Sequence, residues 1–315
     1  MSVLSITPRD ITYRLVRLRR LIVIASIFPV LGMIGSIIVF GGETWYFEPM
    51  NFLLVLAIWM MFICVYVVIF PFDWLEVLVM AFLLSLTLFG ASYFSDLVAL
   101  ARPEKAGFAY FVAIVLMGIA IYVAFLSLTG NLPALGSKVK LSKLRYEYNA
   151  RAEVPMDKLM AQILLKENVD TGFRKTSVAI KNGIFIVRRH LIFPNKKTFV
   201  PEETEFLSFA KVAGKGANTQ VTEFFKNWDD TVSCGCTEEK FEEKEGITTY
   251  YLSEAQCYSN LYSYIRTWIL DSQADFFTCC VDAANGEKPR AMYTRQYITS
   301  HSIIARWMVK NRPPV

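Results

Sequence analysis

Four long apolar runs between residues 21 and 128 constrain the fold of this chain more than any other feature. The runs cover about residues 21–40, 52–70, 77–94 and 107–128, and none has a charged residue in its interior. A hydrocarbon core about 30 Å thick is crossed by a helix of about 20 apolar residues. The pattern therefore predicts a membrane protein with a four-helix transmembrane bundle within residues 21–136.

The charges that flank these runs predict their orientation. Residues 1–20 carry five Arg and one Asp, residues 21–128 carry two basic residues against six acidic ones, and a second basic group follows at residues 138–145. Lys and Arg are retained on the cytoplasmic side of short loops, so we expect both termini in the cytoplasm. We expect an integral protein of a bacterial inner membrane, divided into residues 1–20, 21–136 and 137–315.

Residues 1–20 have the pattern of a short amphipathic helix at the membrane surface. Thr7, Pro8 and Asp10 supply a capping hydroxyl, a proline at the first helical position and a carboxylate in the first turn. The apolar residues then recur at helical spacing, as in a helix that lies on an anionic leaflet. The arginines expected at this interface are Arg14, Arg17, Arg19 and Arg20.

The apolar runs are poor in the groups that conduct ions. Asp73 and Glu76 lie at the edge of the third run, and the interiors hold only small polar residues such as Ser and Thr. Ion and proton pathways normally need ionisable groups at membrane depth, so an anchor is favoured over a transporter. Gly32 and Ser36 form a small-xxx-small pair, which would let another helix approach closely.

From residue 137 the periodicity changes to that of a soluble α+β domain with an antiparallel sheet. Asn182-Gly183 predicts a tight hairpin between strands at 177–180 and 184–187, because both turn positions favour positive φ. The other expected strands are 144–150, 247–252, 276–281 and one that begins at residue 291. The expected helices follow Pro155 and Pro201, cover 221–228 and 253–270, and end the chain.

Charge is distributed unevenly along this domain. Residues 171–201 hold seven basic residues and no acid, whereas residues 202–245 hold eleven acids against five bases. A basic hairpin can bind anionic lipid headgroups or a phosphate-bearing ligand, or it can be a solvated strand face that prevents edge aggregation. The contact residues under the first two hypotheses are Arg174, Lys175, Arg188, Arg189, Lys196 and Lys197. The acidic residues 238–245 are expected in an exposed helical turn or loop.

Catalytic and metal-binding patterns are weak. Cys234, Cys236, Cys279 and Cys280 lack the spacing of a zinc site, and Cys279 and Cys280 fit buried free thiols in a strand. The two histidines are not accompanied by a nucleophile motif, and no dinucleotide or P-loop fingerprint occurs. We therefore expect no metal and no cofactor, and a role other than catalysis is favoured.

These features favour a binding function. The leading hypothesis is a structural or adaptor subunit of a membrane assembly, such as a secretion or conjugation machine. The expected partners are anionic inner-leaflet lipids and other membrane-protein subunits or a second copy of the chain, whereas nucleic acid is not favoured. The alternative is a ligand-gated membrane effector or sensor whose cytoplasmic domain binds an anionic small molecule such as a nucleotide.

Overall fold

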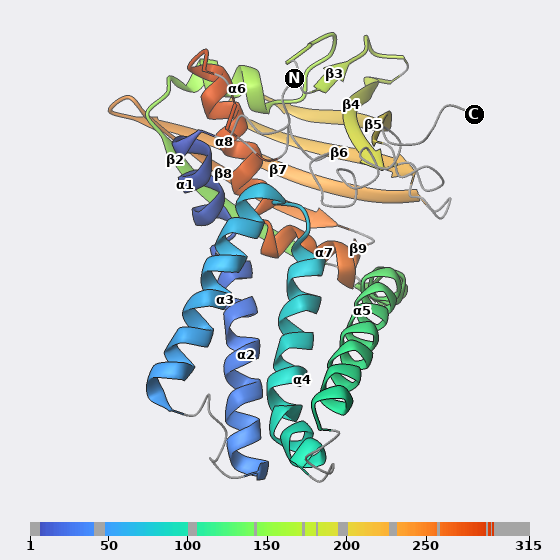
Figure 1. Ribbon diagram of the computed structural model, residues 1–315. Coiled ribbons are helices and arrows are strands. Elements are labelled where there is room, and N and C mark those ends of the chain that lie inside the picture. Colours follow the sequence, from blue (N-terminus) through green and yellow to red (C-terminus); the bar gives the residue numbers. More distant parts are fainter. Residues whose placement is uncertain are drawn as a thin grey trace, which may run out of the picture. The chain divides into compact units, whose positions relative to one another are not determined.

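The computed structural model describes residues 7–40, 48–99, 106–141, 144–171, 174–180, 182–194, 201–226, 232–256, 259–287, 289–290 and 292 (Figure 1). The chain divides into two compact units. One is the helical unit, Thr7–Gly136, and the other begins at Ser137 and is called the sheet domain.

The helical unit is built from α1 (Pro8–Arg17), α2 (Arg19–Phe40), α3 (Pro49–Ile69), α4 (Trp74–Ala99) and α5 (Ala106–Lys138). Stretches of three of these helices, Arg19–Val39, Pro49–Ile69 and Leu116–Lys138, are long and apolar enough to cross a membrane. This layout is that of an integral membrane protein. A helix also forms at the predicted third span, but the apolar stretch of α4 with described side chains, Trp74–Gly90, is shorter than a full span.

The start of α1 follows the predicted capping pattern. The Thr7 hydroxyl accepts a hydrogen bond from the Asp10 amide at 3.2 Å, and the Asp10 carboxylate accepts one from the Thr7 amide at 3.1 Å. This capping box satisfies two of the amide groups that every helix start leaves unpaired. The helix ends at Leu18, so α1 and α2 are separate elements.

Helices α2 and α4 approach closely at Gly32, as the small-xxx-small pair indicated. A Cβ added at Gly32 would lie 2.3 Å from the Ser85 carbonyl oxygen, and the Ser36 side chain is fully buried. Only a residue without a side chain fits at this contact, so Gly32 sets the distance between the two helices.

The sheet domain is built on a seven-stranded antiparallel sheet, which confirms the predicted sheet type (Figure 1). Its strand order is β2-β8-β7-β6-β5-β4-β3. The strands are β2 (Leu144–Ala152), β3 (Arg174–Thr176), β4 (Ile184–Pro194), β5 (Pro201–Lys215), β6 (Asn218–Lys226), β7 (Val232–Lys244) and β8 (Ile247–Gln256). A two-stranded sheet is formed by β1 (Lys140–Leu141) and β9 (Ser259–Asn260).

One face of the large sheet packs against two helices. Helix α6 (Met156–Ile163) and helix α8 (Ser272–Ala284) bury Leu159, Ile163 and Phe277 against Tyr250 of β8. The rings of Tyr250 and Phe277 are stacked with their centroids 5.6 Å apart. A third helix, α7 (Leu261–Ile269), precedes α8. Buried aromatic stacking of this kind fixes α8 on the sheet.

The predicted Asn-Gly turn is confirmed. Asn182 and Gly183 have φ values of 56° and 70°, and the Ile180 amide donates to the Ile184 carbonyl at 2.7 Å. These angles match the turn type whose twist suits a hairpin. The strand expected at 177–180 is wrong, because β3 covers Arg174–Thr176 and residues 177–180 lie outside the described strands.

Two predicted helices, after Pro201 and over 221–228, are wrong, because residues 201–215 form β5 and residues 221–226 belong to β6. Residues 227–228 lie outside the described residues. Val221 is buried whereas Phe224 is exposed, so their three-residue spacing places them on opposite faces of a strand rather than on one face of a helix. When both faces of a strand carry apolar residues, the spacing of these residues along the sequence can resemble that of an amphipathic helix.

Three further assignments also need correction. Strand β8 continues to Gln256, so the helix expected from residue 253 begins only at Leu261. The acidic residues 238–245 lie mostly in β7, not in a helical turn or loop. The apolar run 276–281 belongs to α8 and not to a strand, because short apolar runs do not distinguish buried strands from buried helices. Apart from Met292, the segment expected to form a strand and helix from residue 291 lies outside the described residues.

Candidate binding surface on the open face of the sheet

The face of the large sheet opposite α6 and α8 is called the open face. Along β5, Ser208 and Ala210 are fully buried beneath the helix side, while Leu207 and Phe209 on alternate positions are exposed. This alternation is the ordinary pleat of a strand. Within the sheet domain, α6 and α8 pack on the opposite face, and the open-face side chains of Leu207 and Phe209 are exposed.

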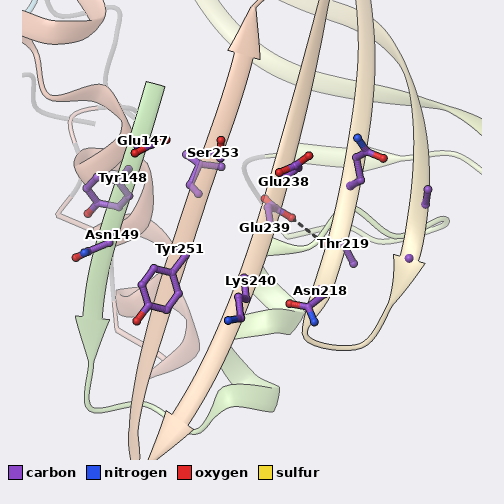
Figure 2. Close-up of a pocket in the computed structure, with 14 residues that line it drawn as sticks. Glu147, Tyr148, Asn149, Asn218, Thr219, Glu238, Glu239, Lys240, Tyr251 and Ser253 are labelled. Atoms are coloured by element: carbon purple, nitrogen blue, oxygen red, sulfur yellow. Dashed lines mark hydrogen bonds between the residues drawn. The ribbon is translucent and has the colours of Figure 1, made fainter. Parts of the chain in front are cut away.

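A shallow hollow of about 690 Å³ occupies part of this face (Figure 2). Asn149, Tyr251, Lys240 and Asn218 lie side by side across it because they are register partners on β2, β8, β7 and β6. A second polar row, Glu147, Ser253, Glu238 and Gln220, runs beside the first. The hollow is therefore lined by side chains of both charge signs.

Lys240 is the central cation of the hollow. Its ammonium lies 2.5 Å from the Glu242 carboxylate and 5.9 Å from the centre of the Tyr251 ring. The hydrogen bond to Glu242 raises the pKa of Lys240, and the same bond lowers the pKa of Glu242. Both groups are charged at neutral pH, so this part of the surface is zwitterionic rather than basic.

Beside the hollow, apolar side chains cross the sheet. Phe209 of β5 and Phe224 of β6 are register partners with 50% and 42% of their surface exposed, and Leu207 lies next to them with 48% exposed. These three residues are called the apolar row. Cys234 of β7 continues it as the partner of Phe224. Single exposed apolar residues are ordinary, whereas adjacent large ones form an apolar patch of the kind that is often found at contact surfaces.

The basic residues expected to form one surface are divided by the strand pleat. Lys175 and Arg188 are register partners, both exposed, and lie on the open face. Arg174 faces the helices, and Arg189 is its register partner on β4. Lys196 and Lys197 lie outside the described residues. Of the six predicted contact residues, the structure brings together Lys175 and Arg188 on an accessible face.

Arg174 instead holds the end of α6. Its guanidinium donates hydrogen bonds to the carbonyls of Gln162, Ile163 and Leu164 at 2.9, 2.7 and 2.8 Å, and its side chain is buried. The last carbonyls of a helix lack partners within the helix, and an arginine satisfies them well. Arg174 is therefore a structural residue and is left out of the contact surface.

The four N-terminal arginines also differ in their surroundings. Arg14 is buried and donates to the Val68 carbonyl near the end of α3. Arg17 donates to the Tyr13 hydroxyl at 3.2 Å and lies over its ring. Arg19 is exposed and donates to the Val16 carbonyl at 2.7 Å, and Arg20 is half-buried. Arg14 thus joins two helices, whereas the other three keep exposed surface.

A second, smaller cavity lies on the helix side of the sheet and was not anticipated from the sequence. This helix-side cavity, about 260 Å³, is lined by Glu223, Glu239, Glu254, Arg174 and Tyr250 among others. Burial raises the pKa of Glu239 to about 7, and the Arg174 charge opposes this shift. Strand alternation through residues 237, 239 and 241 is the signal that would have placed Glu239 inside.

The carboxylates of the helix-side cavity have protein partners. Glu239 accepts hydrogen bonds from Thr219 and Tyr250, each at 3.3 Å. Glu254 accepts from the Gln273 amide at 2.7 Å, and Glu223 accepts from the Ser208 hydroxyl. Buried polar groups that are paired in this way form a structural network rather than a vacant ligand site.

The cysteines do not gather into a metal site in the part of the chain that the structure describes. Cys279 and Cys280 are buried on α8, so the predicted burial holds although the strand does not. Burial raises the pKa of the Cys279 thiol to about 12 and also raises that of Cys280. These thiols are protonated at neutral pH and are poor nucleophiles.

Comparison with protein-family models and with curated proteins found no match to this chain.

Proposed function

We propose that this protein is a membrane-anchored adaptor subunit whose open face binds another protein of a membrane assembly, such as a secretion or conjugation machine. The observation that carries the proposal is the apolar row, Leu207, Phe209 and Phe224, exposed on a face of the sheet. Burial of about 100 Å² of apolar surface contributes roughly 2.5 kcal/mol. Three large side chains thus supply the centre of an interface.

The open face as a whole favours a protein over a lipid surface. Arg188 is the register partner of Leu207, and exposed Lys211 follows Phe209 by two residues on β5, so the immediate neighbours of the apolar row are basic. Further along β7 from Cys234, Glu238 and Glu242 add acidic residues, so the open face carries both charge signs. A protein interface typically has an apolar centre with a polar rim. An anionic leaflet would instead attract a surface of one sign, and the acidic residues here would be repelled.

A pair of matched substitutions tests this proposal. Phe209→Asp puts a charge into the centre of the interface, and Ile247→Asp makes the same change at an exposed residue on β8, outside the apolar row. Full-length protein is purified in mild detergent from its native membrane. We expect the wild type and Ile247→Asp to retain the same stoichiometric partner and Phe209→Asp to lose it. A partner retained equally by both variants would contradict the proposal.

The membrane arrangement that goes with this function has four spans in an inner membrane, with both termini in the cytoplasm. It is supported by the basic residues before the first apolar run and after the fourth. A reporter that is active only in the cytoplasm, fused after Val315, tests the orientation. Activity of a periplasmic reporter at the same position would overturn it.

A second candidate function is a ligand-gated effector that binds an anionic small molecule. The observation in its favour is the pair Lys175 and Arg188, exposed side by side on the open face. Nucleotide binding to the full-length protein, measured calorimetrically in detergent, tests it. Arg188→Glu is expected to weaken such binding at least about tenfold, and no binding by the wild type would remove this candidate.

A further inference from the structure

The two edges of the large sheet differ in length. Strand β3, at one edge, has only three residues, whereas β2, at the other, has nine. Among the described strands, only β8 pairs with β2. Alternate residues of an edge strand direct their amides and carbonyls outward, where another strand can pair with them. The β2 edge is long enough for such pairing, and β3 is not.

The side chains from Arg145 to Glu153, which directly follows the last residue of β2, have a charge symmetry about Asn149. On one side lie Glu147 and then Arg145, and on the other lie Arg151 and then Glu153. All five side chains are exposed. Each charge is therefore matched by the opposite charge at the same distance on the other side of Asn149. Antiparallel pairing of two identical strands about this residue places opposite charges together.

We propose that β2 pairs antiparallel with β2 of a second copy of the chain, with Asn149 opposite Asn149. In this register Glu147 lies opposite Arg151 of the second copy, and Arg145 lies opposite Glu153. The two-fold symmetry repeats each pair, so four charge pairs form. Opposite charges at directly facing positions stabilise a strand pair, and the outward backbone groups gain hydrogen bonds.

The other face of β2 fits the same register. Tyr148 lies opposite Ala150 of the second copy, and Tyr146 lies opposite Ala152. Each bulky ring therefore faces a small side chain, which leaves space for both. The result is a sheet that continues through two copies and brings two open faces into one surface.

Neighbouring registers are disfavoured by charge. In an antiparallel pair, residues with outward backbone groups must lie opposite residues of the same kind, and these recur every second residue. The symmetry centre of two paired β2 strands therefore falls on a residue and never between two residues. A centre at Tyr148 places Arg145 opposite Arg151, and a centre at Ala150 places Glu147 opposite Glu153. A centre at Glu147 places two glutamates together. Like charges at facing positions destabilise a strand pair, so the Asn149 register is the selected one.

In the single copy, Arg145 and Glu147 already contact each other at 3.3 Å, but both side chains are about two-thirds exposed or more. An exposed ion pair of this kind contributes little to stability. Arg145 also donates to the Ser253 hydroxyl of β8 at 3.1 Å, and this bond is exposed as well. Exchange of these two exposed contacts for pairs across the β2 edges therefore opposes association only weakly. Because the β2 edge is distinct from the apolar row, this inference does not depend on the proposed partner binding.

Charge reversal tests the pairing in the full-length protein. Glu147→Arg and Arg151→Glu each put like charges opposite one another, so each variant alone should dimerise at least about tenfold more weakly than the wild type. Mixed together, the two variants regain opposite charges in every 147–151 pair and should form a heterodimer. Analytical ultracentrifugation in detergent measures both effects, with unchanged melting temperature as the folding control. Normal dimerisation of either variant, or failure of the mixture, would overturn the pairing.

A cysteine at the symmetry centre tests the register directly. Facing residues of an antiparallel pair have Cα atoms about 4.5–5.5 Å apart, within the range of a disulfide. Asn149→Cys should give a disulfide-linked dimer on mild oxidation, whereas Thr249→Cys, one strand inside the edge, should not. Both variants retain the native cysteines, so that background is shared. Equal cross-linking of the two variants, or none in either, would contradict the register.

Discussion

At the scale of single residues, Arg174 of β3 connects the sheet to the end of α6. Its three hydrogen bonds satisfy carbonyls at the end of the helix, and its side chain is buried. Arg174→Met removes these donors and leaves the carbonyls without them, at an expected cost of about 2–4 kcal/mol in the free energy of unfolding. Thermal unfolding of the full-length protein in detergent measures the effect.

Lys175 provides the matched control for that prediction. It is the next residue, is exposed, and lies 3.9 Å from Asp170 in a weak surface ion pair. Lys175→Met should change the stability by no more than about 0.5 kcal/mol. Equal effects at the two positions would show that Arg174 does not support α6 in the way described.

Glu239 makes the stability of the sheet domain depend on pH. Burial raises its pKa from 4.5 to about 7 in the folded protein. The folded state then binds more protons than the unfolded state between about pH 4.5 and 7, so the contribution of this group to stability falls as the pH rises through that interval. Above pH 7 the buried carboxylate is charged and its stabilising contribution is lost.

Substitution of Glu239 isolates this contribution. Glu239→Gln keeps an oxygen acceptor for Thr219 and Tyr250 but cannot ionise. At pH 8 we expect the variant to be more stable than the wild type by roughly 1–3 kcal/mol, and at pH 4.5 to lose this advantage. Melting temperatures across this pH range measure the difference, and an advantage independent of pH would argue against a titrating Glu239.

The described cysteines of the sheet domain should differ in reactivity. Cys279 and Cys280 are buried with raised pKa values, whereas Cys234 and Cys236 are half-buried on the open face. Maleimide labelling of the folded protein at pH 7.5, followed by peptide mapping, should modify Cys234 and Cys236 much faster. Rapid labelling of Cys279 or Cys280 before unfolding would indicate that α8 does not cover them.

At the scale of elements, Gly32 controls the packing of α2 on α4. A methyl group at this position would meet the Ser85 carbonyl at 2.3 Å, whereas one at Gly90 would meet nothing within 4 Å. Gly32→Ala should therefore destabilise the helical unit by about 1–3 kcal/mol through overpacking, and Gly90→Ala should have little effect. Thermal aggregation in detergent compares the two, and equal midpoints would contradict the close contact.

The elements also show which patterns can be predicted from the sequence. The N-terminal capping box of α1, the Asn182-Gly183 turn and the alternation in β2 depend on neighbouring residues, and all three are present. Strands β5 and β6 were assigned to helices because their two faces are both partly apolar. The two-residue period of these strands can be recognised only when it is known which face packs on the core, and this depends on the tertiary structure.

The candidate site, like β5 and β6, depends on tertiary structure that local sequence patterns do not reveal. Phe209 and Phe224 were expected to be buried in helices, so the apolar row was missed. The basic residues were found, but neighbouring members such as Arg174 and Lys175 point to opposite faces once they lie in a strand. Net charge along a segment does not determine a surface. The pairing of strands does, and it involves residues far apart in the chain.

At the scale of the whole molecule, hydropathy sufficed to predict a membrane block, and strand periodicity predicted the antiparallel sheet after it. The structure contains three helices long and apolar enough to span a membrane, and an antiparallel sheet follows them. The membrane helices depend on length and hydropathy, and the strands depend on alternation, all of which are properties of single segments. The binding role depends instead on which sheet residues are left exposed.

Site-specific cross-linking tests the central claim, that the open face binds a protein partner, most directly. A photoreactive amino acid is placed at Phe209, or at the control position Ile247, in the full-length protein in its native membrane. We predict one discrete cross-linked partner from position 209, absent from position 247 and reduced by Phe224→Asp. Identical cross-links from both positions, or none from position 209 in intact membranes, would contradict the account.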